Sequence, residues 1–167
     1  MSNNLKKMSY VDMVVVITGA TGGIGSEIAN ALVSNGAMVI LVSRDTNKLK
    51  DLQKKLLRKH SSGSEQVKII TTNLLDNQSF ESLQDQLIQH TPRINVLINN
   101  AGTNHFGLFE DINNEKQEQI LKLNTTVPMQ LISSLLPYIK NHNSQIINIG
   151  STFGSIGYPG FCVYSAS

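Results

Sequence analysis

Short apolar segments of strand length recur along the chain and alternate with segments whose apolar residues have helical spacing. The strand-length segments are rich in valine and isoleucine along most of their length, which is typical of strands buried on both faces of a sheet. They cover residues 12–18, 37–43, 67–72, 94–99 and 145–150. The hydrophobic pattern therefore predicts five buried strands.

The intervening segments place apolar side chains three or four residues apart, which is the spacing of one helix face. In the first of them that face is expected to comprise Ile24, Ile28, Ala31 and Leu32, with Gly36 as a suitable stop. The next two helices are marked by Leu49, Leu52, Leu56 and Leu57 and by Phe80, Leu83, Leu87 and Ile88.

Asp76 is placed to cap the third helix, a long helical stretch covers about residues 115–139, and a further helix is expected to begin at Tyr164. Strands separated by single helices indicate a parallel sheet with helices on both faces. Right-handed crossovers then favour the strand order 3-2-1-4-5. We therefore expect an α/β fold with a doubly wound, Rossmann-like parallel sheet, formed by one domain over residues 1–167.

Composition is ordinary for a folded globular chain, with 40% hydrophobic and 16% charged residues. The longest apolar runs, residues 14–17 and 38–42, are too short to span a membrane, and the N-terminus has no apolar segment of signal-peptide length. The single cysteine, Cys162, cannot form an internal disulfide. These features predict a cytoplasmic protein.

Basic residues exceed acidic ones in the first 60 residues, by 9 to 4. Much of this excess lies in the second predicted helix: Lys48, Lys50, Lys54, Lys55, Arg58 and Lys59. No aromatic residue is interleaved with them, which argues against nucleic-acid binding and for a solvated helix face. The four histidines lack metal-ligand spacing, so no metal site is predicted.

A glycine-rich turn joins the first strand to the first helix. Gly19, Gly23 and Gly25 have the spacing Gly-x-x-x-Gly-x-Gly, with Thr18 before them and Ile24 among them. Such a turn lets the backbone approach a pyrophosphate, and the helix N-terminus offers free N–H groups to it. The pattern in this position predicts a dinucleotide site, and no Gly-Lys-Ser/Thr follows that would indicate a nucleoside triphosphate.

The end of the second strand bears on the choice of dinucleotide. It reads Ser43-Arg44-Asp45. An arginine there binds the 2′-phosphate of NADP, whereas an acidic residue binds the 2′-hydroxyl of NAD. Arg44 and the uncharged Ser43 favour NADP, and Asp45 keeps NAD as the alternative.

Three motifs together resemble the short-chain dehydrogenase/reductase family. They are residues 18–25, the loop Asn-Asn-Ala-Gly at 99–102, and Ser151 followed thirteen residues later by Tyr164. The resemblance implies hydride transfer between a nicotinamide and a small carbonyl or secondary-alcohol substrate. Tyr164 would act as general acid–base and Ser151 as a hydrogen-bond donor to the reacting oxygen.

The resemblance assigns further residues to the site. Asn73, followed by Leu74, falls where the family has an aspartate that touches adenine. A second group would line the cofactor: Asn100, Ala101 and Gly102. Asn124 falls at the family's fourth catalytic position, and Pro128, which has no N–H, leaves the Asn124 carbonyl free for another partner.

Aromatic residues around the serine and tyrosine predict a partly apolar substrate pocket: Phe153, Tyr158 and Phe161. The resemblance also implies a homodimer or homotetramer, assembled through the helix at 115–139 and the helix that Tyr164 begins. A sugar-nucleotide epimerase is disfavoured, because its glycine turn is spaced differently and the loop at 99–102 argues against it.

In the family the tyrosine starts a Tyr-x-x-x-Lys motif, and a phenol, which ordinarily titrates at about pH 10, needs such a cation. That lysine would fall at position 168, one residue past Ser167. We therefore expect the chain to be a fragment that lacks the C-terminal part of the fold and is inactive by itself. The alternative is a truncated, non-catalytic dinucleotide-binding remnant.

Overall fold

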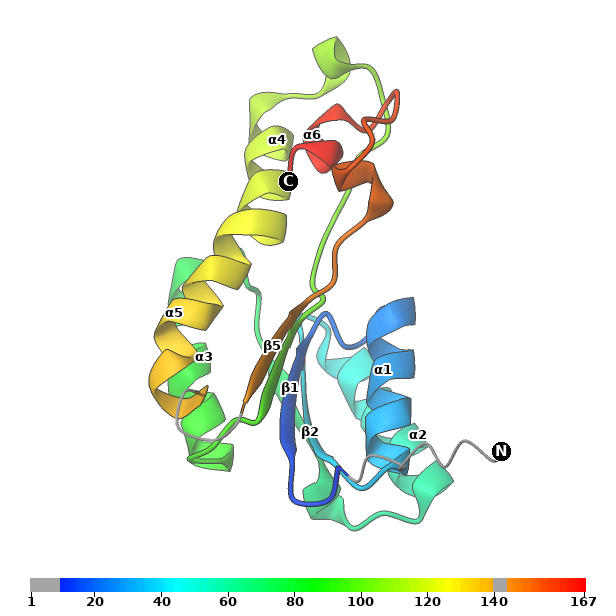
Figure 1. Ribbon diagram of the computed structural model, residues 1–167, viewed down its shortest axis with the longest axis vertical. Helices are drawn as coiled ribbons and strands as arrows, with labels where there is room; N and C mark the ends of the chain where they lie inside the picture. Colours follow the sequence, from blue (N-terminus) through cyan, green and yellow to red (C-terminus); the bar gives the residue numbers. More distant parts are fainter. Residues whose placement is uncertain (1–9, 140–143) are drawn as a thin grey trace, which may run out of the picture.

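The computed structural model describes residues 10–139 and 144–167, so the N-terminal segment considered for a signal peptide lies outside the described residues. Its centre is a parallel sheet with the order β3-β2-β1-β4-β5, as predicted (Figure 1). The strands are β1 (Val14–Thr18), β2 (Met38–Ser43), β3 (Val67–Thr71), β4 (Val96–Asn99) and β5 (Gln145–Asn148).

The strands are shorter than predicted by one or two residues at several ends, because hydrogen bonding changes there. Asp12 has a φ of 68°, a turn conformation, so β1 begins only at Val14. Before β4, the N–H of Ile94 donates to the carbonyl of Tyr138 rather than to a neighbouring strand. The apolar pattern extends past the residues that pair in the sheet.

Helices cover both faces of the sheet (Figure 1). The edge strand β5 is the exception: all four of its residues are exposed, so the prediction of a strand buried on both faces was wrong there. The helices are α1 (Gly23–Ser34), α2 (Thr46–His60), α3 (Asn77–His90), α4 (Asn114–Leu121), α5 (Val127–Ile139) and α6 (Cys162–Ser165). Alternate residues of β1 point to opposite faces: Val15 and Ile17 pack with α1 and α2, whereas Val14 and Val16 pack with α3 and α5. Asp76 caps α3 as predicted, by accepting a hydrogen bond from the N–H of Ser79.

The buried face of α1 differs from the predicted one. The helix buries Gly25, Ala29 and Val33, while Ile24 is 62% exposed and Ala31 is also exposed. The small residues Gly25 and Ala29, four positions apart, let α1 lie close to the glycine turn and to β1. Ile28 and Leu32 of the predicted face still pack, partly buried, against the core, so the prediction is confirmed for these two residues and wrong for Ile24 and Ala31. The exposed Ile24 lies at the edge of a cavity described below.

The long helical stretch is interrupted between α4 and α5 by a π-helical segment, Lys122–Thr126. In it the N–H of Val127 donates to the carbonyl of Lys122, five residues earlier. Pro128, which has no N–H, follows directly. Asn124 therefore lies within a π-helical segment, a feature that was not predicted from the sequence and that is frequent at functional sites.

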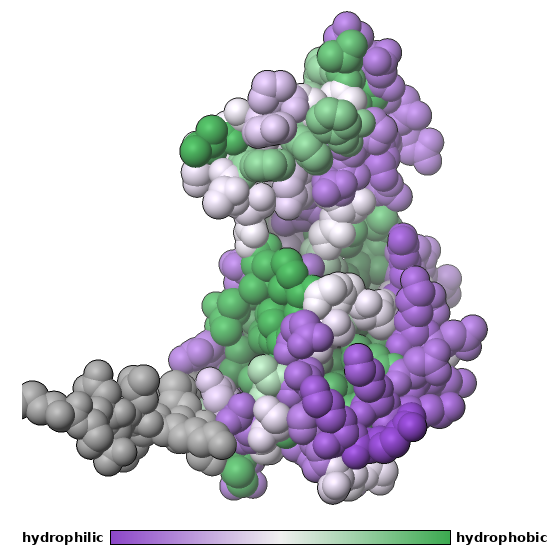
Figure 2. All heavy atoms as spheres, turned by 90° about the vertical axis from the view of Figure 1, so that its right-hand side faces the viewer, coloured by the Kyte–Doolittle hydropathy of each residue, from purple (hydrophilic) through white to green (hydrophobic). Residues whose placement is uncertain are grey.

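The chain leaves the edge strand β5 and runs away from the sheet to α6, which lies beside α4 (Figure 1). Figure 2 shows the surface hollowed between this end of the molecule and the rest. A small core formed by Ile112, Ile120 and Val163 joins these two helices. The last helix begins at Cys162, two residues before the predicted start at Tyr164, because the turn after Phe161 already has helical hydrogen bonding. Among the helices of the described residues, none has the length and apolar character needed to cross a membrane.

Candidate functional site

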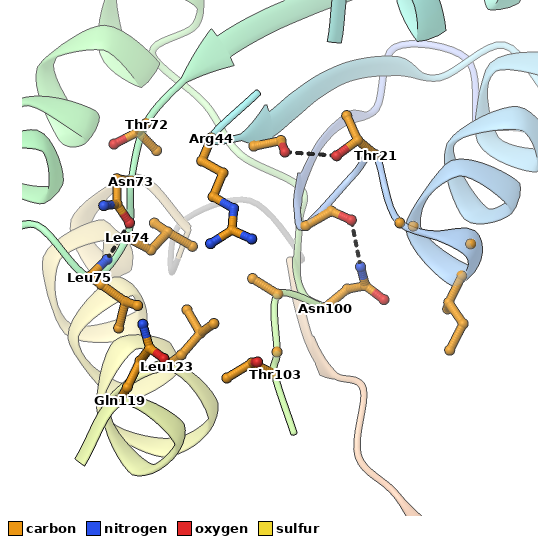
Figure 3. Close-up of a pocket in the computed structure, with 18 of the residues that line it drawn as sticks. Thr21, Arg44, Thr72, Asn73, Leu74, Leu75, Asn100, Thr103, Gln119 and Leu123 are labelled. Carbon is orange, nitrogen blue, oxygen red and sulfur yellow. Dashed lines mark hydrogen bonds between the residues drawn. The ribbon is translucent and has the colours of Figure 1, made fainter. Parts of the chain in front are cut away.

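A cavity of about 640 Å³ lies beyond the carboxyl ends of the central strands (Figure 3). Its walls come from the glycine turn, the end of β2, the loop after β3, the loop after β4 and one face of the helix α4 with the segment that follows it. This is where doubly wound sheets bind nucleotides, between loops that diverge from neighbouring strands. The volume lies within the range of small-ligand sites.

Two glycines of the turn are required by packing within the protein, and a third is not. Gly19 has a φ of +62°, and a Cβ there would lie 2.7 Å from the Cα of Ala101. A Cβ on Gly25 would lie 2.5 Å from the carbonyl oxygen of Gly19. A Cβ on Gly23 would meet nothing within 4 Å, so packing within the protein does not require that glycine.

This contrast predicts opposite behaviour for two alanine variants. Gly25→Ala should destabilise the free protein by about 1–3 kcal/mol, because the fixed backbone around Gly19 cannot accommodate the methyl group. Gly23→Ala should leave the stability of the free protein unchanged or raised by up to about 1 kcal/mol, yet weaken binding of a dinucleotide at the predicted pyrophosphate position at least about tenfold. Urea denaturation and fluorescence titration measure the two effects. Equal loss of stability in both variants would contradict this account.

Thr18 does not line the cavity but fixes the loop that does. Its hydroxyl accepts hydrogen bonds from the backbone N–H groups of Asn100 and Ala101, each at 3.0 Å, and its side chain is buried. The Asn100 amide in turn donates to the carbonyls of Thr18 and Gly19, at 3.0 and 3.1 Å. The two segments that the motifs predicted to bind cofactor are thus bonded directly to one another.

The first asparagine of the 99–102 loop acts within the sheet. The Asn99 amide donates to the side-chain oxygen of Asn148 at 2.8 Å, joining the ends of β4 and β5. Ala101 and Gly102, which follow, line the cavity together with Thr103.

At the end of β2, Arg44 lies on the cavity with its guanidinium directed inward (Figure 3). Ser43 also lines the cavity, and its hydroxyl is hydrogen-bonded to that of Thr21 at 2.8 Å. The carboxylate of Asp45 does not line it. It accepts a hydrogen bond from the N–H of Lys48 at 3.0 Å and caps α2, so this acidic group is occupied as a helix cap.

The cavity lining has cations but no carboxylates. Its two charged residues are Arg44 and Lys116, and none of its residues is aspartate or glutamate. Among the described residues, neither Arg44 nor Lys116 forms an ion pair. The N-terminus of α1, which also faces the cavity, adds partial positive charge. This environment suits an anionic ligand with several phosphate groups.

The loop after β3 closes the cavity on another side. Asn73 and Leu74 line it as predicted, and Leu74 is buried. The Asn73 side-chain oxygen accepts a hydrogen bond from the N–H of Leu75 at 3.2 Å, which shapes the loop.

Several lining residues were missed from the sequence: Thr21, Gly22, Thr72, Leu75, Thr103, Lys116, Gln119 and Leu123. Three of them, Lys116, Gln119 and Leu123, lie at i, i+3 and i+7 along one helical face. Their spacing was visible in the sequence, but nothing in it indicated that this face turns toward the cofactor loops.

Asn124, in the π-helical segment, joins two other parts of the chain. Its side-chain amide donates to the carbonyl of Thr103 and to the hydroxyl of Ser167, both at 2.9 Å, and its side-chain oxygen accepts from the N–H of Thr103 at 2.9 Å. The Ser167 hydroxyl donates to the carbonyl of Tyr164 at 2.8 Å. Asn124 is therefore connected through Ser167 to the segment that holds Tyr164.

Ser151 and Tyr164 each interact with Phe153. The Ser151 hydroxyl accepts a hydrogen bond from the N–H of Phe153 at 3.2 Å. The ring of Phe153 meets that of Tyr164 edge-on, with centroids 6.3 Å apart, and is stacked on that of Tyr158 at 4.9 Å. Among the described residues no hydrogen bond joins Ser151 to Tyr164, and neither of them lines the cavity.

Comparison with known proteins agrees with this geometry. The family model for short chain dehydrogenases matches residues 13–167. An uncharacterized oxidoreductase of Staphylococcus saprophyticus is 34% identical over 163 residues, which cover 97% of this chain and 62% of that protein. Dehydrogenase/reductase SDR family member 7B of Xenopus laevis is 33% identical over 157 residues, or 92% of this chain and 49% of that protein.

Among solved structures, a metagenomic short-chain oxidoreductase in complex with NADP has a TM-score of 0.86 and 27% identity, over 95% of this chain and 71% of that one. The chain thus spans between about half and two thirds of the curated relatives' lengths. The family model covers nearly the whole sequence, including the five strands of the sheet, the glycine turn and the loop at 99–102. The chain belongs to the short-chain dehydrogenase/reductase family of oxidoreductases.

Proposed function

We propose that this chain forms the cofactor-binding part of an NADP-preferring oxidoreductase that interconverts a carbonyl compound and a secondary alcohol. The single observation behind the cofactor preference is the charge of the cavity, which contains Arg44 and Lys116 and no carboxylate. The ribose 2′-phosphate of NADP adds negative charge at the position where an arginine after the second strand binds it. The position of Asp45 suggested a ribose ligand for NAD. Its carboxylate instead caps α2, which weakens the case for NAD.

The cofactor, when bound, supplies or accepts the hydride. Gly23 and the N-terminus of α1 leave open space and free N–H groups for the pyrophosphate. The Tyr164 hydroxyl gives a proton to the substrate oxygen during reduction and removes it during oxidation. The Ser151 hydroxyl donates a hydrogen bond to the same oxygen. Asn124 keeps the end of α6 in place through Ser167, and so supports Tyr164.

A polypeptide of residues 1–167 has no lysine four positions after Tyr164. We therefore expect this polypeptide to show negligible turnover, because no such cation lowers the pKa of the phenol. NADPH consumption with a panel of neutral aldehydes and ketones tests this. The full-length protein should oxidise NADPH with at least one of them, and the 1–167 polypeptide should not. Turnover by the 1–167 polypeptide equal to that of the full-length protein would refute the need for a cation beside Tyr164. NADPH binding without turnover in the full-length protein would instead favour a non-catalytic dinucleotide-binding role.

We further expect a homodimer or homotetramer in the cytoplasm. Apolar side chains are exposed along α4 and α5, namely Leu121, Met129 and Leu136, and such a surface is a reasonable interface between copies. The exposed thiol of Cys162 suits a reducing compartment.

A further inference from the structure

We propose that Lys122 is a positioning residue that holds the adenine-side wall of the cavity against the π-helical segment. This inference rests on the proposed cofactor site but concerns a residue outside the cavity lining. The wall is the loop after β3, whose residues Asn73, Leu74 and Leu75 all line the cavity.

Two hydrogen bonds join Lys122 to this loop. Its ammonium group donates to the backbone carbonyl of Leu75 and to the side-chain oxygen of Asn77, each at 2.9 Å. Leu75 lies within the wall, and Asn77 is the first residue of α3. One cation therefore binds both the cavity loop and the helix that follows it, across 45 or more positions of sequence.

Besides Lys122, two long-range contacts hold this loop: the N–H of Thr72 donates to the carbonyl of Ser43 at 2.9 Å, and Leu74 is buried in the core. The Asn73 oxygen and the Leu75 N–H bond within the loop itself. The Thr72 hydroxyl donates to the carbonyl of Ser79, also a local contact. The pKa of the Asp76 carboxyl is lowered, chiefly by hydrogen bonds from Ser79 and also by the positive charge of Lys122. Thr72 and Leu74 hold the start of the loop, whereas among the described residues the long-range hydrogen bonds to residues 75–77 come from Lys122.

Within the π-helical segment, the two residues that follow Lys122 also contribute to the cavity or its walls. Leu123, the next residue, lines the cavity, and Asn124 holds Thr103 on the opposite wall. Of these three consecutive residues, Lys122 bonds to the loop after β3, Asn124 bonds to Thr103 on the opposite wall, and Leu123 lines the cavity between them. Removing the Lys122 bonds frees the adenine-side wall while leaving the Asn124 bonds intact.

The test compares Lys122→Met with Lys122→Arg, which keeps a cationic donor, and with Lys68→Met as a matched control. Lys68 also forms a hydrogen bond through its ammonium group, but with Glu65, which like Lys68 does not line the cavity. In the full-length protein, Lys122→Met should weaken NADPH and 2′,5′-ADP about tenfold, with a raised KM for the cofactor and unchanged kcat. Lys122→Arg should recover most of the affinity, and Lys68→Met should match the parent protein.

Amide hydrogen exchange of the cofactor-free protein provides a readout that does not depend on the proposed function. Lys122→Met should accelerate exchange in residues 73–77. If the parent protein binds no NADPH but this acceleration is seen, the positioning role stands and the proposed function fails. Should Lys122→Met not fold, Asn77→Ala removes one acceptor and should show a smaller effect of the same kind. Unchanged affinity together with unchanged exchange, or an equal loss in Lys68→Met, would overturn the inference.

Discussion

Replacing Tyr164 with phenylalanine is expected to lower kcat of the full-length protein by about 10²- to 10⁴-fold, the usual contribution of a positioned general acid–base. The change removes one oxygen atom and keeps the ring, which lies edge-on to Phe153 and to Phe161. The free energy of unfolding should therefore remain nearly constant. The affinity for NADPH should also be unchanged, because Tyr164 does not line the cofactor cavity.

Tyr158→Phe is the matched control for this prediction. It makes the same chemical change in a ring stacked on the same neighbour, Phe153, and should retain most of the activity. Steady-state kinetics with NADPH and an active carbonyl substrate measure both variants. If Tyr164→Phe keeps more than about one tenth of the parent kcat, a loss far smaller than general acid–base catalysis provides, Tyr164 is not the acid–base residue.

The second large effect is expected at Arg44. Arg44→Ala should weaken NADPH binding by about 10- to 100-fold, because a charge-assisted hydrogen bond to phosphate contributes about 1.5–3 kcal/mol. NADH lacks the 2′-phosphate, so its affinity should change by less than about twofold, a small part of that contribution. The preference for NADPH over NADH should therefore largely disappear.

Arg58→Ala controls for the loss of one positive charge from the same region of the chain, since Arg58 is an exposed residue of α2 outside the cavity lining. It should bind both cofactors as the parent does. Equal weakening of NADPH and NADH in Arg44→Ala would refute Arg44 as the ligand of the 2′-phosphate.

The sheet was predictable because its strands are short, largely apolar segments rich in valine and isoleucine and separated by single helices. Each of the five strands was located, and the order followed from the handedness of the crossovers. The glycine turn was also predictable from the sequence. Gly19 and Gly25 are required there because other backbone atoms lie too close to leave room for a side chain. Asp76 was recognised as a cap because capping depends only on local sequence.

Other features depend on contacts between distant segments. The buried face of α1 was predicted only in part: Ile28 and Leu32 pack against the core, but close packing against the glycine turn buries Gly25 and Ala29 and leaves Ile24 exposed. Thr18 holds the 99–102 loop by hydrogen bonds to residues that begin 82 positions later in the sequence. Neither segment by itself indicates this contact. The cavity wall formed by α4 and the bonds of Lys122 likewise require the three-dimensional fold.

The most direct test of the central claim, that the cationic cavity binds an NADP-type dinucleotide, is calorimetric titration of the purified full-length protein with NADPH and with NADH. We expect saturable binding of both, with NADPH at least about tenfold tighter, as one charge-assisted contact to the 2′-phosphate provides. Tighter binding of NADH, or no binding of either, would contradict the claim.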